Sequence, residues 1–216
     1  MIENNLVLED LQCKGLFIYQ GKDGYRFTSD AVALANYLTV KNNGVLVDLC
    51  SGSGVIGILA NAKNRISQVW LVELQSNLAQ MSQKSIEYNK LLNFKVVNQK
   101  LQEIHKDIGV AIADTVVCNP PYFTKDNKLK LNSELAIART EIAVTLEEII
   151  EEASKLLKQG GKLFLSHKES RLCDIICDCR KYGIEPKEVK ILKSTKGENE
   201  VLIKAIKGGK VGFKIT

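Results

Sequence analysis

Two adjacent prolines between an asparagine and a tyrosine are the feature of this 216-residue chain that predicts the most specific chemistry. The segment reads Asn119, Pro120, Pro121, Tyr122 and Phe123 and follows a short apolar run. Proline has no backbone N–H and pushes the preceding residue into extended geometry, so the turn presents two acceptors, the Asn119 side-chain oxygen and the Pro120 carbonyl. These match the two hydrogens of an –NH2 group, whereas a keto oxygen there would lack a donor at a cost of about 1–3 kcal/mol. The segment therefore predicts a catalytic site, Asn119 to Tyr122, that activates an exocyclic or amide nitrogen.

Aromatic rings beside these acceptors favour a planar substrate. Tyr122 can stack on a base or amide face with help from Phe123, and such stacking contributes roughly 1–3 kcal/mol per base. The alternative is a proline-rich loop with a core aromatic residue. The position of the segment after a strand at the edge of a sheet favours the binding role, so we interpret both rings as substrate-binding.

A glycine-rich turn earlier in the chain predicts a ligand site. The sequence DLCSGSG runs from Asp48 to Gly54 and joins an apolar run to a helical pattern. Gly52 and Gly54 allow positive φ and close approach of a ligand, but the turn lacks both the G-x-G-x-x-G fingerprint and the GK[ST] ending of phosphate-binding loops. Glu73 ends the next apolar run, where a carboxylate can accept hydrogen bonds from ribose hydroxyls. The combination favours a nucleoside-like ligand without phosphates.

The elements that must position these groups alternate between strands and helices, which is typical of an α/β fold with a parallel sheet covered on both faces. Gly160 and Gly183 are expected to stop the third and fourth helices. The last two apolar runs are β-rich and predict a C-terminal hairpin. The expected strands are 45–50, 69–74, 94–98, 114–119, 161–167, 188–194 and 200–207, and the expected helices are 55–61, 76–91, 145–159 and 168–182.

In this arrangement the sequence resembles the class I S-adenosylmethionine-dependent methyltransferases over roughly residues 25–207. The resemblance implies a Rossmann-like, seven-stranded, mostly parallel sheet with an antiparallel C-terminal strand. It places Asp48 near the methionine amino group, Gly52 and Gly54 against the cofactor and Glu73 on its ribose, and it counts Asn119 among the cofactor-binding residues. S-adenosylmethionine is then the only cofactor, and no metal is expected because the sulfonium carries its own leaving group.

One position departs from the family pattern. Related enzymes often carry an aspartate shortly after the third strand that reads the adenine amino group, and here that place falls at Lys100, which offers no acceptor. We expect backbone groups together with Leu74 or Leu101 to hold the adenine instead.

A narrower resemblance is to the bacterial family that methylates N6 of adenine 37 in a valine tRNA. It rests on YRFTSDAVALANYL at 25–38, ARTE at 138–141, the C-terminal hairpin and NPPYF taken together. The resemblance makes Phe27 and Asp30 cofactor-binding, although a hydrophobic staple and an N-cap would explain them equally well. Arg139 is expected to contact substrate phosphate or, alternatively, to form a surface salt bridge.

Composition sets the remaining expectations. Residues 187–216 hold eight lysines and three glutamates, a basic end that suits either tRNA phosphates or a solvated sheet edge. Without a long apolar run or a signal-like start, we expect a cytoplasmic protein with no membrane contact and no obligatory protein partner. The six cysteines are interpreted as reduced. Residues 1–43 are expected to form a preface packed on a catalytic domain of residues 44–216.

Other functions remain open for the same motifs. A release-factor glutamine methyltransferase shares NPPY but usually resembles a longer chain with an N-terminal helical domain. A ribosomal RNA guanine-N2 methyltransferase shares the nitrogen chemistry. A non-catalytic cofactor-binding scaffold would keep the fold without turnover.

Overall fold

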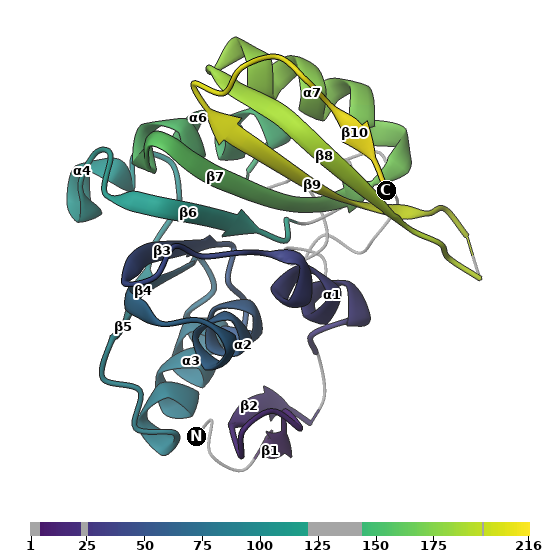
Figure 1. Cartoon of the computed structure of the whole chain (residues 1–216). Coiled ribbons are helices and arrows are strands. Elements are labelled where there is room, and N and C mark those ends of the chain that lie inside the picture. Colours follow the sequence, from purple (N-terminus) through teal and green to yellow (C-terminus); the bar gives the residue numbers. More distant parts are fainter. Residues whose placement is uncertain (1–4, 23–25, 121–143, 196) are drawn as a thin grey trace.

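A single mixed sheet forms the centre of the protein (Figure 1). The structure is a computed structural model that describes residues 5–22, 26–120, 144–195 and 197–216. Its strand order is β10-β8-β9-β7-β6-β3-β4-β5, while β1 and β2 form a separate hairpin. The strands are β1 Leu6–Asp10, β2 Phe17–Gly21, β3 Gly44–Leu49, β4 Ile66–Glu73, β5 Phe94–Asn98, β6 Ala113–Cys118, β7 Leu157–Lys168, β8 Ile184–Leu192, β9 Glu200–Lys207 and β10 Lys214–Ile215.

The described helices are α1 Ser29–Tyr37, α2 Val55–Lys63, α3 Ser76–Tyr88, α4 His105–Ile108, α6 Leu146–Leu156, the 3-10 turn η2 Glu169–Arg171, and α7 Leu172–Lys181. Two hydrophobic clusters show how they cover the sheet. One cluster joins the inner faces of α6 and α7 to the sheet, and the other joins α1 and α2 to the opposite face. The predicted α/β fold with helices on both faces is therefore confirmed.

The predicted seven strands are present, with one addition at the edge. β9 is antiparallel to both β7 and β8, as a C-terminal hairpin requires. The expected antiparallel C-terminal strand is therefore β9, and the added strand is the two-residue β10, which pairs with β8 in parallel. In the described part of the chain, no helix is long and apolar enough to cross a membrane.

The central strands bring the predicted motifs together at one edge of the sheet. β3 is flanked by β4 and β6, with Leu49 opposite both Val72 and Cys118. The chain segments that leave these three parallel strands therefore start side by side, and they contain the glycine turn, Leu74 and Asn119. This carboxyl edge is where open α/β sheets hold their ligands.

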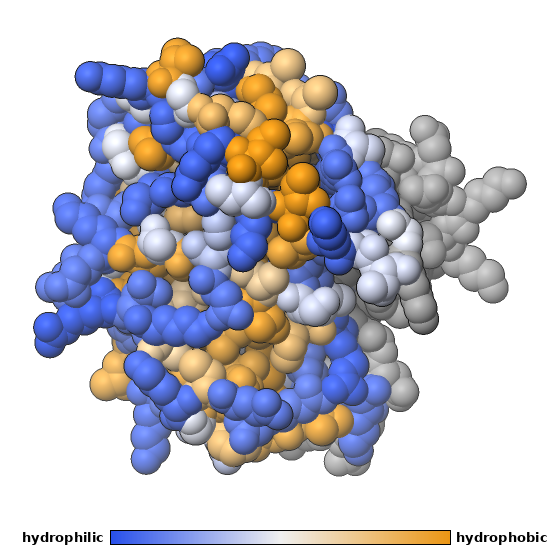
Figure 2. Space-filling model, turned by 45° about the vertical axis from the view of Figure 1, so that its right-hand side comes forward, coloured by the Kyte–Doolittle hydropathy of each residue, from blue (hydrophilic) through white to orange (hydrophobic). Residues whose placement is uncertain are grey.

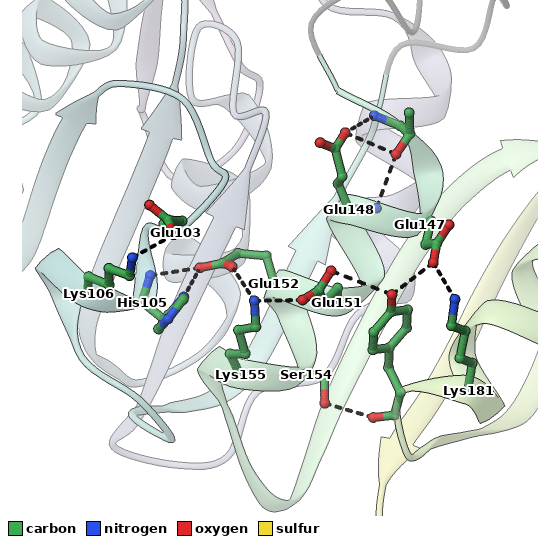
Figure 3. Close-up of polar contacts among 12 residues, drawn as sticks. Glu103, His105, Lys106, Glu147, Glu148, Glu151, Glu152, Ser154, Lys155 and Lys181 are labelled. Carbon is green, nitrogen blue, oxygen red and sulfur yellow. Dashed lines mark hydrogen bonds and ion pairs between the residues drawn. The ribbon is translucent and has the colours of Figure 1, made fainter.

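Helix α6 is fixed at both ends and along its side (Figure 3). Thr145 and Glu148 form a capping box at its start. Glu152, almost fully buried, accepts hydrogen bonds at 2.7 Å from both the backbone N and Nδ1 of His105 in α4. Its carboxylate is also 3.7 Å from Lys155, which pairs with Glu151 at 2.8 Å. These contacts lie at the opposite end of α6 from the Thr145 cap and connect α4 to α6.

Two predicted helix boundaries were wrong. α6 ends at Leu156 and β7 begins at Leu157, so Gly160 lies inside the strand, at φ +76°, rather than after the helix. Asp30 is not an N-cap, because Thr28 holds that position and Asp30 lies in the first turn of α1. Gly183, at φ +72°, does follow the end of α7 as predicted.

The N-terminal hairpin was not predicted. It attaches to α3, where the Phe17 backbone N–H donates to Asn89 Oδ1 and the Tyr19 N–H donates to Ser85 Oγ, both at 2.9 Å. The rings of Phe17 and Tyr19 both meet the Tyr88 ring edge-on. Ile18 on the other face of β2 is fully buried in the same hydrophobic cluster as α1 and α2.

Candidate active site

The glycine turn after β3 contains three residues with positive φ. Cys50, Gly52 and Gly54 have φ of 56°, 58° and 85°, and Gly54 is the N-cap of α2. A Cβ on Gly54 would lie 2.8 Å from Leu71 Cδ1 and 3.1 Å from Ser82 Oγ. Ser82 Oγ itself donates to the Gly52 carbonyl at 3.0 Å. The turn thus packs directly on β4 and α3, and only glycine fits at its end.

We predict that Gly54→Ala destabilises the protein more than Gly183→Ala does. Both positions have positive φ, but a Cβ on Gly183 would meet nothing within 4 Å. Gly183→Ala should therefore cost only the backbone strain of about 1 kcal/mol, whereas Gly54→Ala adds overpacking of about 1–3 kcal/mol. Urea unfolding measures the difference, and equal losses would show that the turn does not pack on Leu71 as described.

Asp48 is a fully buried carboxylate beside this turn. Its Oδ2 accepts from the Gly57 backbone N–H at 3.0 Å, which ties the end of β3 to the first turn of α2. Burial, with a smaller contribution from the nearby Glu73 charge, raises the pKa of Asp48 to about 8. A buried acid with a raised pKa gains most from a cationic partner, because the partner offsets the cost of its charge.

Glu73, at the end of β4, is a second buried carboxylate that contacts the glycine turn. Its Oε2 accepts from the Gly52 backbone N–H and its Oε1 from the Gln75 N–H, each at 2.8 Å. Burial raises the pKa of Glu73, while these backbone hydrogen bonds oppose the rise. Each carboxylate oxygen has two lone pairs, so both can still accept a hydroxyl hydrogen from a ligand.

Three buried polar atoms around the glycine turn have no hydrogen-bond partner among the described residues: Asp48 Oδ1, Ser51 Oγ and Ser53 Oγ. Buried polar groups normally have partners, and such atoms mark places for a ligand or ordered water. A carboxylate oxygen suits an ammonium group, and hydroxyls suit a carboxylate. The residues present therefore fit the amino-acid end of S-adenosylmethionine.

The other predicted cofactor residues differ in burial and in their contacts. Leu74 is 36% exposed at the same edge, and Asn98 at the end of β5 donates to the Leu74 carbonyl at 3.0 Å. Leu101 is buried in the hydrophobic core instead of facing solvent. Lys100 is exposed. Phe27 is half-buried next to α1, and its N–H donates to Gln20 Oε1 at 2.9 Å.

Asn119 leaves β6 beside the glycine turn and is joined to two distant elements. Its Nδ2 donates to Asp30 Oδ2 at 3.0 Å, and its Oδ1 accepts from Ser166 Oγ of β7. Pro120 is buried immediately after it. The structure therefore brings together Asp30, Asp48, Glu73 and Asn119, which are far apart in sequence. Pro121, Tyr122, Phe123 and Arg139 lie outside the described residues.

Sequence analysis missed four polar residues of this site: Ser51, Ser53, Asn98 and Ser166. Ser51 and Ser53 lie within the glycine motif, so their position alone was a signal. Asn98 is the last residue of the third predicted strand, 94–98. Ser166 had no local signal, because its contact with Asn119 depends on the parallel pairing of β6 with β7.

Comparison with known proteins agrees with this fold. TYW2 of M. jannaschii, solved in complex with AdoMet, superposes with a TM-score of 0.68 at 15% identity over 94% of this chain and 85% of that one. A predicted O-methyltransferase, protein Atu636 from Agrobacterium tumefaciens, gives 0.67 at 20% identity over 86% and 84%. The fold is thus the Rossmann-like fold of class I methyltransferases. Residues 26–174 match the family model described as methyltransferase small domain, and the chain belongs to that family.

Curated relatives divide between two activities. The release factor glutamine methyltransferase of Bifidobacterium longum is 30% identical over 158 residues, 64% of this chain and 54% of the relative. The tRNA1(Val) (adenine(37)-N6)-methyltransferase of Shewanella frigidimarina is 24% identical over 182 residues, 82% and 68% respectively. The same-named protein of Photobacterium profundum is also 24% identical, over 84% and 77%. The chain thus spans about half of the first relative and more of the tRNA enzymes.

Proposed function

We propose that this protein transfers a methyl group from S-adenosylmethionine to the N6 amino group of an adenine in tRNA, adenine 37 of a valine tRNA being the expected target. The observation that carries the proposal is the acceptor oxygen of Asn119 beside the buried Asp48 and Glu73 carboxylates. The relatives that cover most of this chain's length carry the matching name.

Each residue has a distinct task in this reaction. Asp48, Ser51 and Ser53 would bind the charged amino-acid end of the cofactor, and Glu73 would bind its ribose. S-adenosylmethionine supplies an electrophilic methyl group. Asn119 Oδ1 and the Pro120 carbonyl accept the two hydrogens of the adenine amino group, which turns the nitrogen lone pair out of conjugation and toward the methyl group. On transfer the bond between sulfur and the methyl group would break as the bond to nitrogen forms, with S-adenosylhomocysteine as the leaving group. The methylated nitrogen would then be positively charged and acidic, and it would lose one proton to solvent, so no strong base is required.

A lysine-rich sheet face beside Asn119 supports an RNA substrate. Phe164, Lys204, Glu188 and Lys214 lie opposite one another across β7, β9, β8 and β10. Residues opposite in register share a face, and Phe164 packs on the α1 side. By strand alternation, Lys162 and Lys190 lie on this face too.

The described carboxylates on this lysine face are paired: Glu188 lies 3.2 Å from Lys214, and Glu200, on the same face by strand alternation, lies 2.7 Å from Lys168. Burial, together with the charge of Lys204, lowers the pKa of Lys162, as expected where cations lie close together. Lys190 in β8 pairs with Leu202 in β9, and Leu202 pairs with Ser166 in β7. Lys190 and Ser166 are therefore two strands apart, a distance of roughly 10 Å. A nucleotide chain with its base at Asn119 can therefore reach the lysine face with its phosphates. Figure 2 shows the mixture of hydrophilic and hydrophobic residues on the side of the molecule that carries the C-terminal strands.

Replacing Lys190 and Lys214 by glutamine is expected to raise KM for tRNA several-fold and leave kcat within about twofold. Loss of phosphate contacts should also reduce the salt dependence of kcat/KM by a slope of about 1–2. Steady-state kinetics at several salt concentrations measures both. The matched control is Lys90→Gln with Lys95→Gln, two exposed lysines before and within β5, at the other edge of the sheet from β8 and β10. Equal KM values in both double variants would contradict docking on the lysine face.

The release-factor alternative has a direct test, and the Bifidobacterium longum relative, 30% identical to this chain, carries that name. Purified enzyme and labelled cofactor are offered a valine tRNA transcript and, separately, a release factor. We expect label in the tRNA only. Label in the protein would replace adenine by a glutamine amide as the substrate, with the same Asn119 chemistry.

A further inference from the structure

The nitrogen and the oxygen of the Asn119 side-chain amide are both hydrogen-bonded to buried residues. Its nitrogen donates to Asp30 Oδ2 at 3.0 Å, from the first turn of α1, and Asp30 is only 5% exposed. Its oxygen accepts from Ser166 Oγ in β7, and Ser166 is fully buried. The two partners lie 89 and 47 residues from Asn119 in the chain.

The chemistry of these partners permits one orientation of the amide. A carboxylate only accepts hydrogen bonds, so the amide nitrogen must face Asp30. If the amide turned over, its oxygen would face the carboxylate and its –NH2 would face Ser166. Ser166 could adapt, since a hydroxyl both donates and accepts, but Asp30 could not. Asp30 therefore decides the orientation, and Ser166 adds to it.

Orientation matters because substrate recognition depends on an acceptor. With the nitrogen facing Asp30, Oδ1 is the amide atom on the other side, and an amide oxygen can accept a substrate hydrogen. A turned amide would present a donor to an amino group that also donates. Moreover, a charged acceptor on the amide nitrogen polarises the amide and makes its oxygen a stronger acceptor.

We propose that Asp30 and Ser166 are positioning residues that hold the Asn119 oxygen toward the amino group of the substrate. This rests on the proposed function, in which Asn119 is the acceptor. It differs from the cofactor-binding role that family resemblance implies for Asp30, and the two roles predict different kinetic effects.

The kinetic test compares Asp30→Ala, Asp30→Asn and Ser166→Ala with the wild type. Asp30→Ala should lower kcat about 10- to 100-fold and leave the Kd for S-adenosylmethionine within about threefold, on the order of one lost charged hydrogen bond. Asp30→Asn should recover part of the loss, because an asparagine oxygen can accept from Asn119. Ser166→Ala should have a smaller effect in the same direction. Matched controls are Asp114→Asn and Ser67→Ala, hydrogen-bonded residues at the opposite edge of the sheet.

A second readout is independent of any substrate. The side-chain amide signal of Asn119, assigned by its absence in Asn119→Ala, is recorded by 1H–15N NMR. We expect Asp30→Ala to shift this signal and speed its hydrogen exchange, while Asp114→Asn leaves it unchanged. An unshifted signal, or weakened cofactor binding with unchanged kcat, would overturn the positioning role. A shifted signal in a protein that leaves tRNA unmethylated would uphold it and reject the proposed function alone.

Discussion

Replacing Asn119 by alanine is expected to lower kcat by at least about 10²–10³-fold while the Kd for S-adenosylmethionine stays within about threefold. The variant removes the side-chain acceptor that lies beside the glycine turn and keeps the Asp48 and Glu73 carboxylates in place. An interaction that acts on the reacting nitrogen should be lost from kcat rather than from cofactor binding.

Stability must be followed in the same variant, because Asn119→Ala leaves Asp30 without the amide that donates to it. The free energy of unfolding should fall by about 1–3 kcal/mol, which is compatible with a folded enzyme. Asn61→Ala is the matched control, since Asn61 accepts a side-chain hydrogen bond from Asn93 at 2.9 Å, away from the site. Turnover equal to that of the wild type would reject the acceptor mechanism.

Replacing Asp48 by asparagine is expected to weaken cofactor binding about 10- to 100-fold, the loss of one charged hydrogen bond. In the protein without cofactor, Asp48→Asn should also raise the free energy of unfolding relative to the wild type, and this difference should grow as pH rises. The pKa of Asp48 is about 8 in the folded chain and about 3.9 in an unfolded one. The folded state therefore binds the proton more tightly, and its free energy of unfolding falls between about pH 4 and pH 8 through this group.

Asparagine carries no charge at any of these pH values. The Asp48→Asn variant therefore lacks this group's decrease in the free energy of unfolding between about pH 4 and pH 8. The variant and the wild type should unfold at similar temperatures near pH 5. At pH 8 the variant should be more stable by at least about 1 kcal/mol, or 2–4 °C in the thermal midpoint. Calorimetry at both pH values measures the difference. A midpoint difference that does not change with pH would mean that Asp48 is not held protonated in the folded chain.

Much of the fold could be predicted from the sequence because its strands are buried and apolar. Every predicted strand and helix of the catalytic region exists, and Asp48, Gly54 and Asn119 fall at the edge where the pattern placed them. This follows from topology: once β3, β4 and β6 are parallel neighbours, the residues that leave their ends must meet.

The errors come from contacts that local sequence does not encode. The N-terminal hairpin is stabilised by side chains of α3, Ser85 and Asn89, which accept from its backbone. Gly160 looked like a helix stop, but its positive φ serves an irregular start of β7 instead. Asp30 looked like a cap or a cofactor ligand, and its hydrogen bond to Asn119 appears only when α1 packs against the end of β6.

The most direct test of the central claim is the transfer of labelled methyl groups to tRNA by the purified protein, followed by digestion and mass spectrometry of the nucleosides. With an unmodified valine tRNA transcript, we predict one product, N6-methyladenosine, that maps to adenine 37 and is absent when Asn119→Ala replaces the wild type. A labelled guanosine, or a valine tRNA that stays unlabelled while a protein glutamine is methylated, would contradict the claim.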